Sequence, residues 1–336
     1  MNAEIRDITS KNDIMVTVFL ITYNHAPYIR QTMDAILNQK INFKMQLLVH
    51  DDASTDGTGE IIREYADRFP DIITMIIQRE NKYQKNIAVD LEAIPYIYGK
   101  YVALCEGDDY WPTDDKLRKQ VDYMERHSNI AGTGGLTRFY DDNDVECMES
   151  MPDSRFLNRV IEKNEYIYGK GFNVATNTLM FWPEIIKDAN YIQARKISPK
   201  VADSLIVTNM FNYGSVYMFE DCFQNHRIQM RAESSNYNSL FDTKEKFEDR
   251  IRLLNAQVTC LKTQNMKRWY IITAGMYFWV FLKEHNVKSF FEVAKKVTDG
   301  YRKYTILAVL YTFFVFVPKL IFNHLKRVTI IFNRKD

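Results

Sequence analysis

Residues 101–112 read YVALCEGDDYWP, and this stretch decides how the chain around it is organised. The apolar run Tyr101–Cys105 is typical of a buried strand. Three carboxylates follow it within four residues, and they are Glu106, Asp108 and Asp109. Adjacent carboxylates repel one another, so such a cluster is costly unless a positive group lies among them. Because Mg²⁺ and Mn²⁺ prefer oxygen ligands, the stretch predicts a site for one of these cations.

The alternative is a solvated acidic turn before a helix that Thr113 or Asp114 caps. Tyr110 and Trp111 argue against this alternative, because exposed loops rarely carry two large aromatic side chains without a packing or binding reason.

The chain before this stretch alternates between strand and helix patterns. Apolar runs that predict strands cover Ile14–Thr22, Met45–His50, Ile72–Gln78 and Tyr101–Cys105. Helical spacing of apolar residues covers Tyr28–Gln39, Gly59–Phe69, Asn86–Tyr98 with a bend at Pro95, and Thr113–His127. Such an alternation predicts a parallel sheet with helices on both faces.

Three of the four strands end in polar loops, which are Thr22–Asn24, Asp51–Asp56 and Glu106–Asp109. Ligands of open α/β sheets bind beyond the carboxyl ends of the strands. We therefore expect the three loops to converge on one crevice.

The pattern after residue 127 is less regular. It predicts an irregular strand at Ile130–Phe139, a loop-rich insertion at Tyr140–Lys170, a strand at Asn173–Phe181, a helix opened by Pro183, a helix at Ser198–Phe211 and a strand at Ser215–Phe219.

Charge is distributed unevenly along the 336 residues, although the net charge is only +1. Residues 262–336 contain 14 Lys or Arg and 4 Asp or Glu, together with uncharged runs at Trp269–Leu282 and Tyr304–Val317. Each run is shorter than the roughly 20 residues of a spanning helix. We therefore predict a domain at 1–230 and a helical C-terminal region at 231–336 that associates with an anionic membrane surface. A spanning helix and a helical core subdomain are the alternatives.

Compartment follows from two weaker signals. The four cysteines show no metal-ligand or disulfide spacing, and Met1–Asp13 is too polar for a secretory signal. These signals favour a cytoplasmic protein, peripheral to the inner face of the membrane. Nucleic acid is not expected as a partner, because long aliphatic runs separate the basic residues of the tail.

Several nucleotide-binding motifs are absent from the sequence. The segment after the first strand, Tyr23–Pro27, has no glycine, so it is no dinucleotide fingerprint, and no P-loop occurs. The motifs that are present, VTVFLITYN at 16–24, DDASTDGT at 51–58 and EGDDYW at 106–111, resemble those of the family 2 glycosyltransferases. The resemblance covers roughly residues 14–230 and implies a GT-A fold with a Rossmann-like, mainly parallel sheet.

The resemblance also implies roles for matching residues. Donor-binding positions are Thr22, Tyr23, Asn24, Asp51, Asp52, Lys85, Glu106, Gly107, Asp108 and Arg227. Asp51 is expected at the base of the nucleotide, and Arg227 at its diphosphate. Lys85 is a candidate for the diphosphate from its place in the loop before the third predicted helix, and a solvated surface position is its alternative role. Asp108 and Asp109 are expected at the Mn²⁺ or Mg²⁺ ion. Glu106 stands where the family has Asp, and Gln229 where it has His.

Inverting members of the family use a general base, which the resemblance places at Asp203, with Glu220 and Asp221 as competing choices. A helix cap is the alternative role of Asp203. The implied function is metal-dependent transfer of a hexosyl or N-acetylhexosaminyl group from a nucleotide-sugar donor, UDP above all, to a lipid-linked or polysaccharide acceptor in bacterial surface-glycan synthesis. The alternative is a non-catalytic, membrane-peripheral binding protein of the same fold. The sequence does not name the donor sugar, the acceptor, the linkage or the oligomeric state.

Overall fold

The computed structural model describes residues 3–141, 143–168, 172–228 and 243–261, with residues 274, 277–279, 281–282 and 288–292. The chain divides into two compact units, Met1–Glu233 and Ser234–Asp336, and each unit is described by itself.

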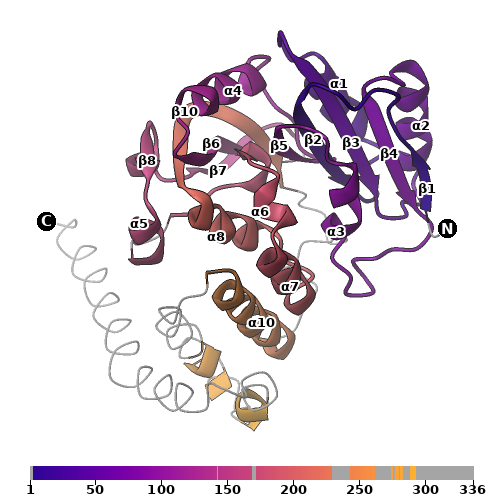
Figure 1. Ribbon diagram of the computed structural model, residues 1–336. Helices are drawn as coiled ribbons and strands as arrows, with labels where there is room; N and C mark the ends of the chain where they lie inside the picture. The colour runs from indigo at the N-terminus through magenta and orange to yellow at the C-terminus, as the bar shows by residue number, and fades with distance from the viewer. Residues whose placement is uncertain are drawn as a thin grey trace, which may run out of the picture. The chain divides into compact units, whose positions relative to one another are not determined.

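The first unit is built on one mixed sheet (Figure 1). Its strands are β1 (Ala3–Arg6), β2 (Ile14–Thr22), β3 (Lys44–Asp51), β4 (Ile73–Gln78), β5 (Tyr101–Glu106), β6 (Ile130–Tyr140), β7 (Glu146–Met151), β8 (Arg159–Ile161), β9 (Met180–Phe181) and β10 (Ser215–Arg227). Their order is β1-β4-β3-β2-β5-β9-β6-β10-β8, and β7 pairs with β6.

Helices connect these strands. They are α1 (Ile29–Leu37), α2 (Thr58–Arg68), α3 (Asp90–Ala93), α4 (Lys116–Arg126), α5 (Lys163–Tyr168), α6 (Glu184–Lys187), α7 (Ala189–Ile197) and α8 (Asp203–Tyr213), with the 3₁₀ turns η1 (Ile94–Tyr96), η2 (Ser154–Phe156) and η3 (Thr176–Thr178).

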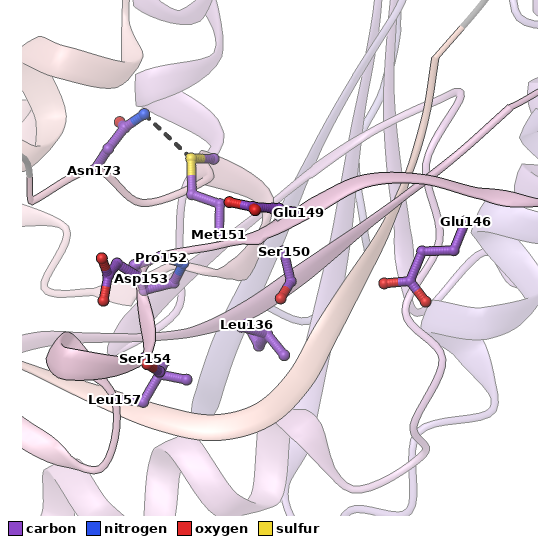
Figure 2. A pocket seen from close by; sticks show the side chains of 10 residues that line it. All are labelled: Leu136, Glu146, Glu149, Ser150, Met151, Pro152, Asp153, Ser154, Leu157 and Asn173. Carbon is purple, nitrogen blue, oxygen red and sulfur yellow. Dashed lines mark hydrogen bonds between the residues drawn. The ribbon is translucent and has the colours of Figure 1, made fainter. Parts of the chain in front are cut away.

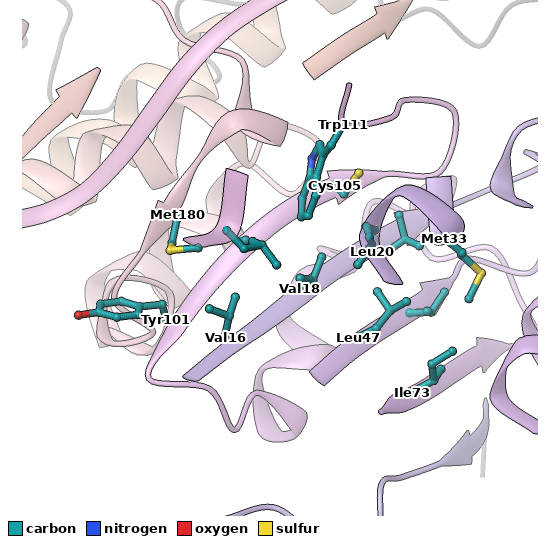
Figure 3. Packing of buried hydrophobic residues seen from close by; sticks show 14 of the residues in the cluster. Val16, Val18, Leu20, Met33, Leu47, Ile73, Tyr101, Cys105, Trp111 and Met180 are labelled. Atoms are coloured by element: carbon teal, nitrogen blue, oxygen red, sulfur yellow. The ribbon is translucent and has the colours of Figure 1, made fainter. Parts of the chain in front are cut away.

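Strands β4, β3, β2 and β5 are parallel, and the four strands predicted from apolar runs are confirmed to within one residue. One face of these strands packs against α1, α2 and α4. Figure 3 shows residues of this cluster, among them Met33 of α1. Val16, Val18 and Leu20 alternate along β2 and are fully buried among Met33 of α1 and Leu117 of α4. Because the opposite face of β2 is buried too, the strand reads as a continuous apolar run.

The second half of the sheet is not simply parallel. The two-residue strand β9 pairs antiparallel with both β5 and β6, whereas β6 and β10 are parallel. The predicted strand at Asn173–Phe181 is wrong over most of its length, because the chain closes the turn η3 before it enters β9.

Three other boundaries differ from the predictions. Asn86–Tyr98 is not one helix: Asn86 has φ +56°, α3 begins only at Asp90, and the chain tightens into η1 where Pro95 lies. The insertion at residues 140–170 contains β7, β8 and α5. β10 extends well beyond Phe219, because it pairs with β6 as far as Arg227.

The described part of the second unit is the helix α10 (Thr243–Leu261) and a few residues beyond it. Phe247 of α10 stacks on Phe290, with 5.0 Å between ring centroids. No helix among the described residues is both long and apolar enough to cross a bilayer. The run Tyr304–Val317 lies outside the described residues, as does most of Trp269–Leu282.

Candidate active site

The loops after β2 and β3 are bonded to each other. The backbone N–H of Asn24 donates to Ser54 Oγ at 2.8 Å, and the Thr55 N–H donates to Asn24 Oδ1 at 2.9 Å. Asn24 adopts φ +55°, a conformation that Asn tolerates better than most residues. The Asp51 carboxylate accepts from the Ser54 backbone and hydroxyl, and burial raises the pKa of Asp51.

Asp52 lies beside Asp51 but fixes a different segment. Its carboxylate is 3% exposed and accepts from the backbone N–H groups of Lys82 and Tyr83 at 2.7 and 3.0 Å. Asp52 therefore holds the loop after β4 against the loop after β3. Lys85, farther along this loop, is exposed and forms an ion pair with Glu80.

The three carboxylates after β5 converge as predicted. One oxygen from each of Glu106, Asp108 and Asp109 lies within 4.8 Å of the others. Burial and the charges of Asp109 and Asp108 raise the pKa of Glu106 to about 8. Burial also raises the pKa of Asp108, although His25 opposes that shift. This mutual repulsion of oxygen ligands is the condition that a divalent cation relieves, so the residues fit such an ion.

Gly107 brings this cluster close to the loop after β2. A Cβ atom on Gly107 would lie 2.4 Å from Thr22 Oγ1 and 2.8 Å from His25 Nδ1, which leaves no room for a side chain. His25 Nε2 in turn lies 3.7 Å from Asp108 Oδ2. Thr22, predicted at the donor, is 1% exposed and packs against the acidic stretch.

Asp109 differs from the other two acids because its carboxylate is completely buried. Its Oδ2 accepts from Asn177 Nδ2 at 2.6 Å and from Gln224 Nε2 at 2.5 Å, and its Oδ1 accepts from the Arg227 N–H at 3.0 Å. His226 Nδ1 lies 2.9 Å from Oδ2. Burial alone would lower the pKa of His226, but its hydrogen bond with Asp109 raises it to about 9. Asp109 thus anchors β10 and η3, whatever it contributes to a cation.

Arg227 covers the acidic stretch. Its guanidinium carbon lies 5.0 Å from the Tyr28 ring centroid and 4.8 Å from that of Tyr110. Its Nη1 donates to the carbonyl of Asp108 at 2.5 Å, and its Nη2 donates to Gln31. The predicted diphosphate-binding arginine is therefore held beside the carboxylates. Gln229, the residue that departs from the family pattern, lies outside the described residues.

Asp203 begins α8 and lies exposed at its N-terminus. The protein around its carboxylate removes hydration and raises the pKa of Asp203, while the polar Thr176 side chain and the charge of Arg195 oppose that rise. The charge of Asp203 also contributes to the raised pKa of Glu106. The competing choice Asp221 instead accepts from Lys119 Nζ at 2.5 Å.

Sequence reasoning missed several side chains of the site. His25 was within a loop already singled out, but Asn177 was hidden inside a predicted strand. Gln224 meets Asp109 only because β10 runs beside β6. The signal that could have indicated the close approach of β10 is the glycines at 132, 134 and 135 in β6. A Cβ on Gly135 would lie 2.4 Å from the Phe223 ring of β10.

A separate cavity of about 660 Å³ lies beside β7 (Figure 2). Carboxylates of Glu146, Glu149 and Asp153 line it, and Asn173 donates to Met151 Sδ at its edge. The β5 acids are not part of its lining.

Part of this chain matches a known protein family. Residues 17–182 match the family described as glycosyl transferase family 2. The uncharacterized protein Rv1520 of Mycobacterium tuberculosis is 41% identical over 115 residues, which are 33% of this chain and 32% of the relative. Escherichia coli WfaP, a UDP-Glc:alpha-D-GlcNAc-diphosphoundecaprenol beta-1,3-glucosyltransferase, is 31% identical over 112 residues, 33% of this chain and 41% of the relative. The matches thus span less than half of these relatives.

The fold has solved counterparts. The crystal structure of S. aureus TarS 1-349 in complex with UDP has a TM-score of 0.51 at 15% identity, and covers 85% of this chain and 92% of that chain. At this identity the likeness shows a shared fold. The mixed sheet flanked by helices fits the GT-A fold that the sequence predicts.

Proposed function

Because residues 17–182 belong to glycosyl transferase family 2, we propose that this chain is an inverting glycosyltransferase that uses a UDP-sugar donor. The observation that carries the proposal is the cluster of Glu106, Asp108 and Asp109, in which one oxygen from each carboxylate lies within 4.8 Å of the others. WfaP, which takes its sugar from UDP-Glc, supports the choice of nucleotide.

Donor binding is assigned to the bonded loops after β2, β3 and β5. We assign the base and ribose to Asp51 and Asn24, whose loops are bonded to each other, and the diphosphate to the cationic side chain of Arg227, which lies beside Asp108. Asp108, together with Asp109, would hold Mn²⁺ or Mg²⁺, with Glu106 beside them. When bound, this cation supplies Lewis-acid stabilisation of the negative charge on the departing diphosphate.

Asp203 is assigned the base. It accepts the proton of an acceptor hydroxyl while the oxygen forms a bond to the anomeric carbon and the bond from that carbon to the diphosphate oxygen breaks. Attack from the face opposite the leaving group inverts the anomeric centre. The surroundings that raise the pKa of Asp203 strengthen its hold on that proton, and its exposed position allows an acceptor to approach.

The proposed acceptor is a lipid-linked or polysaccharide glycan. WfaP acts on a diphosphoundecaprenol-linked sugar, which supports a lipid-linked acceptor and the hexosyl or N-acetylhexosaminyl class of transfer. The basic residues between 262 and 336 support a place at the cytoplasmic face of a membrane, where such acceptors would be presented.

The test is a screen of nucleotide sugars with Mn²⁺ and lipid-linked glycans, in which release of nucleotide diphosphate is measured. We expect Asp203→Asn to lower kcat by about 10²- to 10⁴-fold, the usual contribution of a general base. Asp221→Asn is the matched control and should stay within a few-fold of wild type. Equal activity of the Asp203→Asn variant and wild type would remove Asp203 from the mechanism, and binding of UDP without any turnover would favour the non-catalytic alternative.

A further inference from the structure

The side chain of Arg227 lies over two tyrosine rings that come from different parts of the chain. Its guanidinium carbon is 5.0 Å from the centroid of the Tyr28 ring and 4.8 Å from the centroid of the Tyr110 ring. Tyr28 immediately precedes α1, and Tyr110 belongs to the stretch after β5. All three residues are partly buried. An aromatic face attracts a cation at this distance, and the attraction is stronger where water is partly excluded.

Each of the two tyrosines is itself fixed in place. The Asn225 N–H of β10 donates to the Tyr110 carbonyl at 2.9 Å, and the Tyr110 N–H donates to the Asn225 carbonyl at 3.3 Å, which makes an isolated antiparallel bridge. Asn225 Nδ2 also donates to the Tyr110 hydroxyl at 2.8 Å. The Tyr28 N–H donates to the His25 carbonyl at 2.9 Å. Because these bonds hold both tyrosines, their rings present a preformed surface to Arg227.

Hydrogen bonds and the order of the strands decide where this guanidinium lies in the site. Arg227 Nη1 donates to the Asp108 carbonyl at 2.5 Å, and Nη2 donates to Gln31 Oε1 in the first turn of α1. In the sheet, β10 lies on the other side of β5 from β2 and β3, whose loops are assigned the base and ribose. Arg227 therefore comes from the side of the β5 acids that is farther from the base. Guanidinium groups bind phosphate oxygens through charge-assisted hydrogen bonds, so this place suits the terminal phosphate of a nucleoside diphosphate.

We propose that Tyr28 and Tyr110 are positioning residues that hold the Arg227 guanidinium ready for the terminal phosphate of the donor's nucleoside diphosphate. A long arginine side chain loses rotamer freedom when it binds a ligand, and the two rings remove part of this cost in advance. The rings act through Arg227 and not on the nucleotide. This inference rests on the proposed function for the identity of the ligand, whereas the contacts between the rings and Arg227 do not depend on it.

Loss of one ring should weaken the binding of UDP more than the binding of UMP, which lacks the terminal phosphate. We expect Tyr110→Leu to raise the Kd for UDP with Mn²⁺ about 3- to 10-fold in calorimetry, while the Kd for UMP changes by less than about 2-fold. Tyr28→Leu should have the same effect, and it takes the place of Tyr110→Leu if that variant does not fold. Tyr28→Phe keeps the ring and should restore the affinity for UDP.

A double-mutant cycle shows whether the rings act through Arg227. In an Arg227→Ala background, Tyr110→Leu should not change the Kd for UDP further, because the group that the ring holds is already absent. Losses that multiply independently would contradict the inference. Tyr98→Leu is the matched control, because Lys11 Nζ lies 4.7 Å from the Tyr98 ring centroid. Tyr98 precedes β5, at the opposite end of this strand from the acids, so its loss should leave the Kd for UDP unchanged.

NMR of the full chain labelled with ¹⁵N-arginine shows without any nucleotide whether the rings hold the guanidinium. The Nε–H signal of Arg227 is assigned by its loss in Arg227→Lys. Because ring currents shift nearby protons, this signal should move in Tyr110→Leu and stay in place in Tyr98→Leu. If it does not move, or if Tyr110→Leu weakens UDP and UMP equally, the inference is wrong. If wild type binds no UDP, the proposed function fails, while the NMR signal still decides whether the rings position Arg227.

Discussion

Two loops of this protein carry the same pattern, an apolar strand followed by a pair of aspartates, but the second aspartate of each pair has different partners. Asp52, after β3, accepts from two backbone N–H groups about thirty positions away in the chain. Asp109, after β5, accepts from Asn177, Gln224 and Arg227, which lie between 68 and 118 positions away. One carboxylate fixes a loop, and the other joins the two halves of the sheet.

The largest effect is expected from removing the charge of the aspartate that joins the halves. Asp109→Asn should lower the free energy of unfolding by about 4 kcal/mol, because a buried charged partner of His226 is lost and an amide N–H₂ then faces other donors. Asp52→Asn should lower the free energy of unfolding by about 2 kcal/mol. The effect is smaller because Asp52 accepts only from backbone N–H groups and has no charged partner, so these groups lose a charged acceptor. Urea denaturation of both variants measures the difference.

Asp108→Asn is the control for this pair, because Asp108 is partly exposed. It should change the unfolding free energy by less than about 1 kcal/mol, yet abolish metal-dependent turnover. The comparison breaks down if Asp52→Asn proves as destabilising as Asp109→Asn.

The second prediction concerns the buried cation that follows the β5 loop. Lys116 is completely buried, and its Nζ has no hydrogen-bond partner among the described residues. It lies 3.9 Å from the Trp111 ring centroid, and burial lowers its pKa to about 7. The unfolded chain binds a proton at this amine up to about pH 10.5, so stability should rise with pH between 7 and 10.5.

Lys116→Met should therefore raise the free energy of unfolding at pH 6 by roughly 3 kcal/mol. The variant avoids the cost of burying the charged amine, and it loses the smaller favourable contact of that amine with the Trp111 ring. The gain should shrink as the pH approaches 10, which denaturation at several pH values can show. Lys82→Met is the opposite control, because Lys82 Nζ lies 3.3 Å from Glu92 and its loss should destabilise. A gain for Lys116→Met that does not vary with pH would contradict a depressed pKa.

The smallest effect is expected at the loop beyond Asp52. Lys85 pairs with Glu80 at the surface, so Lys85→Ala should be indistinguishable from wild type in urea. The KM for the donor should also stay within twofold. A tenfold rise in this KM would instead show that Lys85 leaves Glu80 and reaches the diphosphate, the role that its place in the loop suggested.

Prediction from sequence was accurate where one segment carries its own signal. The strands around Val18, Leu48 and Ala103 are buried on both faces, so their apolar runs have the right length and end at the right loops. It was inaccurate where a segment depends on distant partners. Thr176 and Asn177 lie in a segment that the sequence predicts as a strand, but the Leu179 N–H bonds back to the Thr176 carbonyl and closes a turn. The distant residues Trp111 and Gln120 donate to the carbonyls of this turn.

The sequence by itself determined the parallel half of the sheet, the acids at its edge and the family, because hydrophobic periodicity and short motifs are local properties. Only the tertiary structure decided that Asp109 faces inward, that β10 returns beside β6, and that Asn177 of the turn η3 bonds to Asp109. The physical reason is that a carboxylate takes whichever donors the packing of the chain brings to it, and those donors are encoded a hundred residues away.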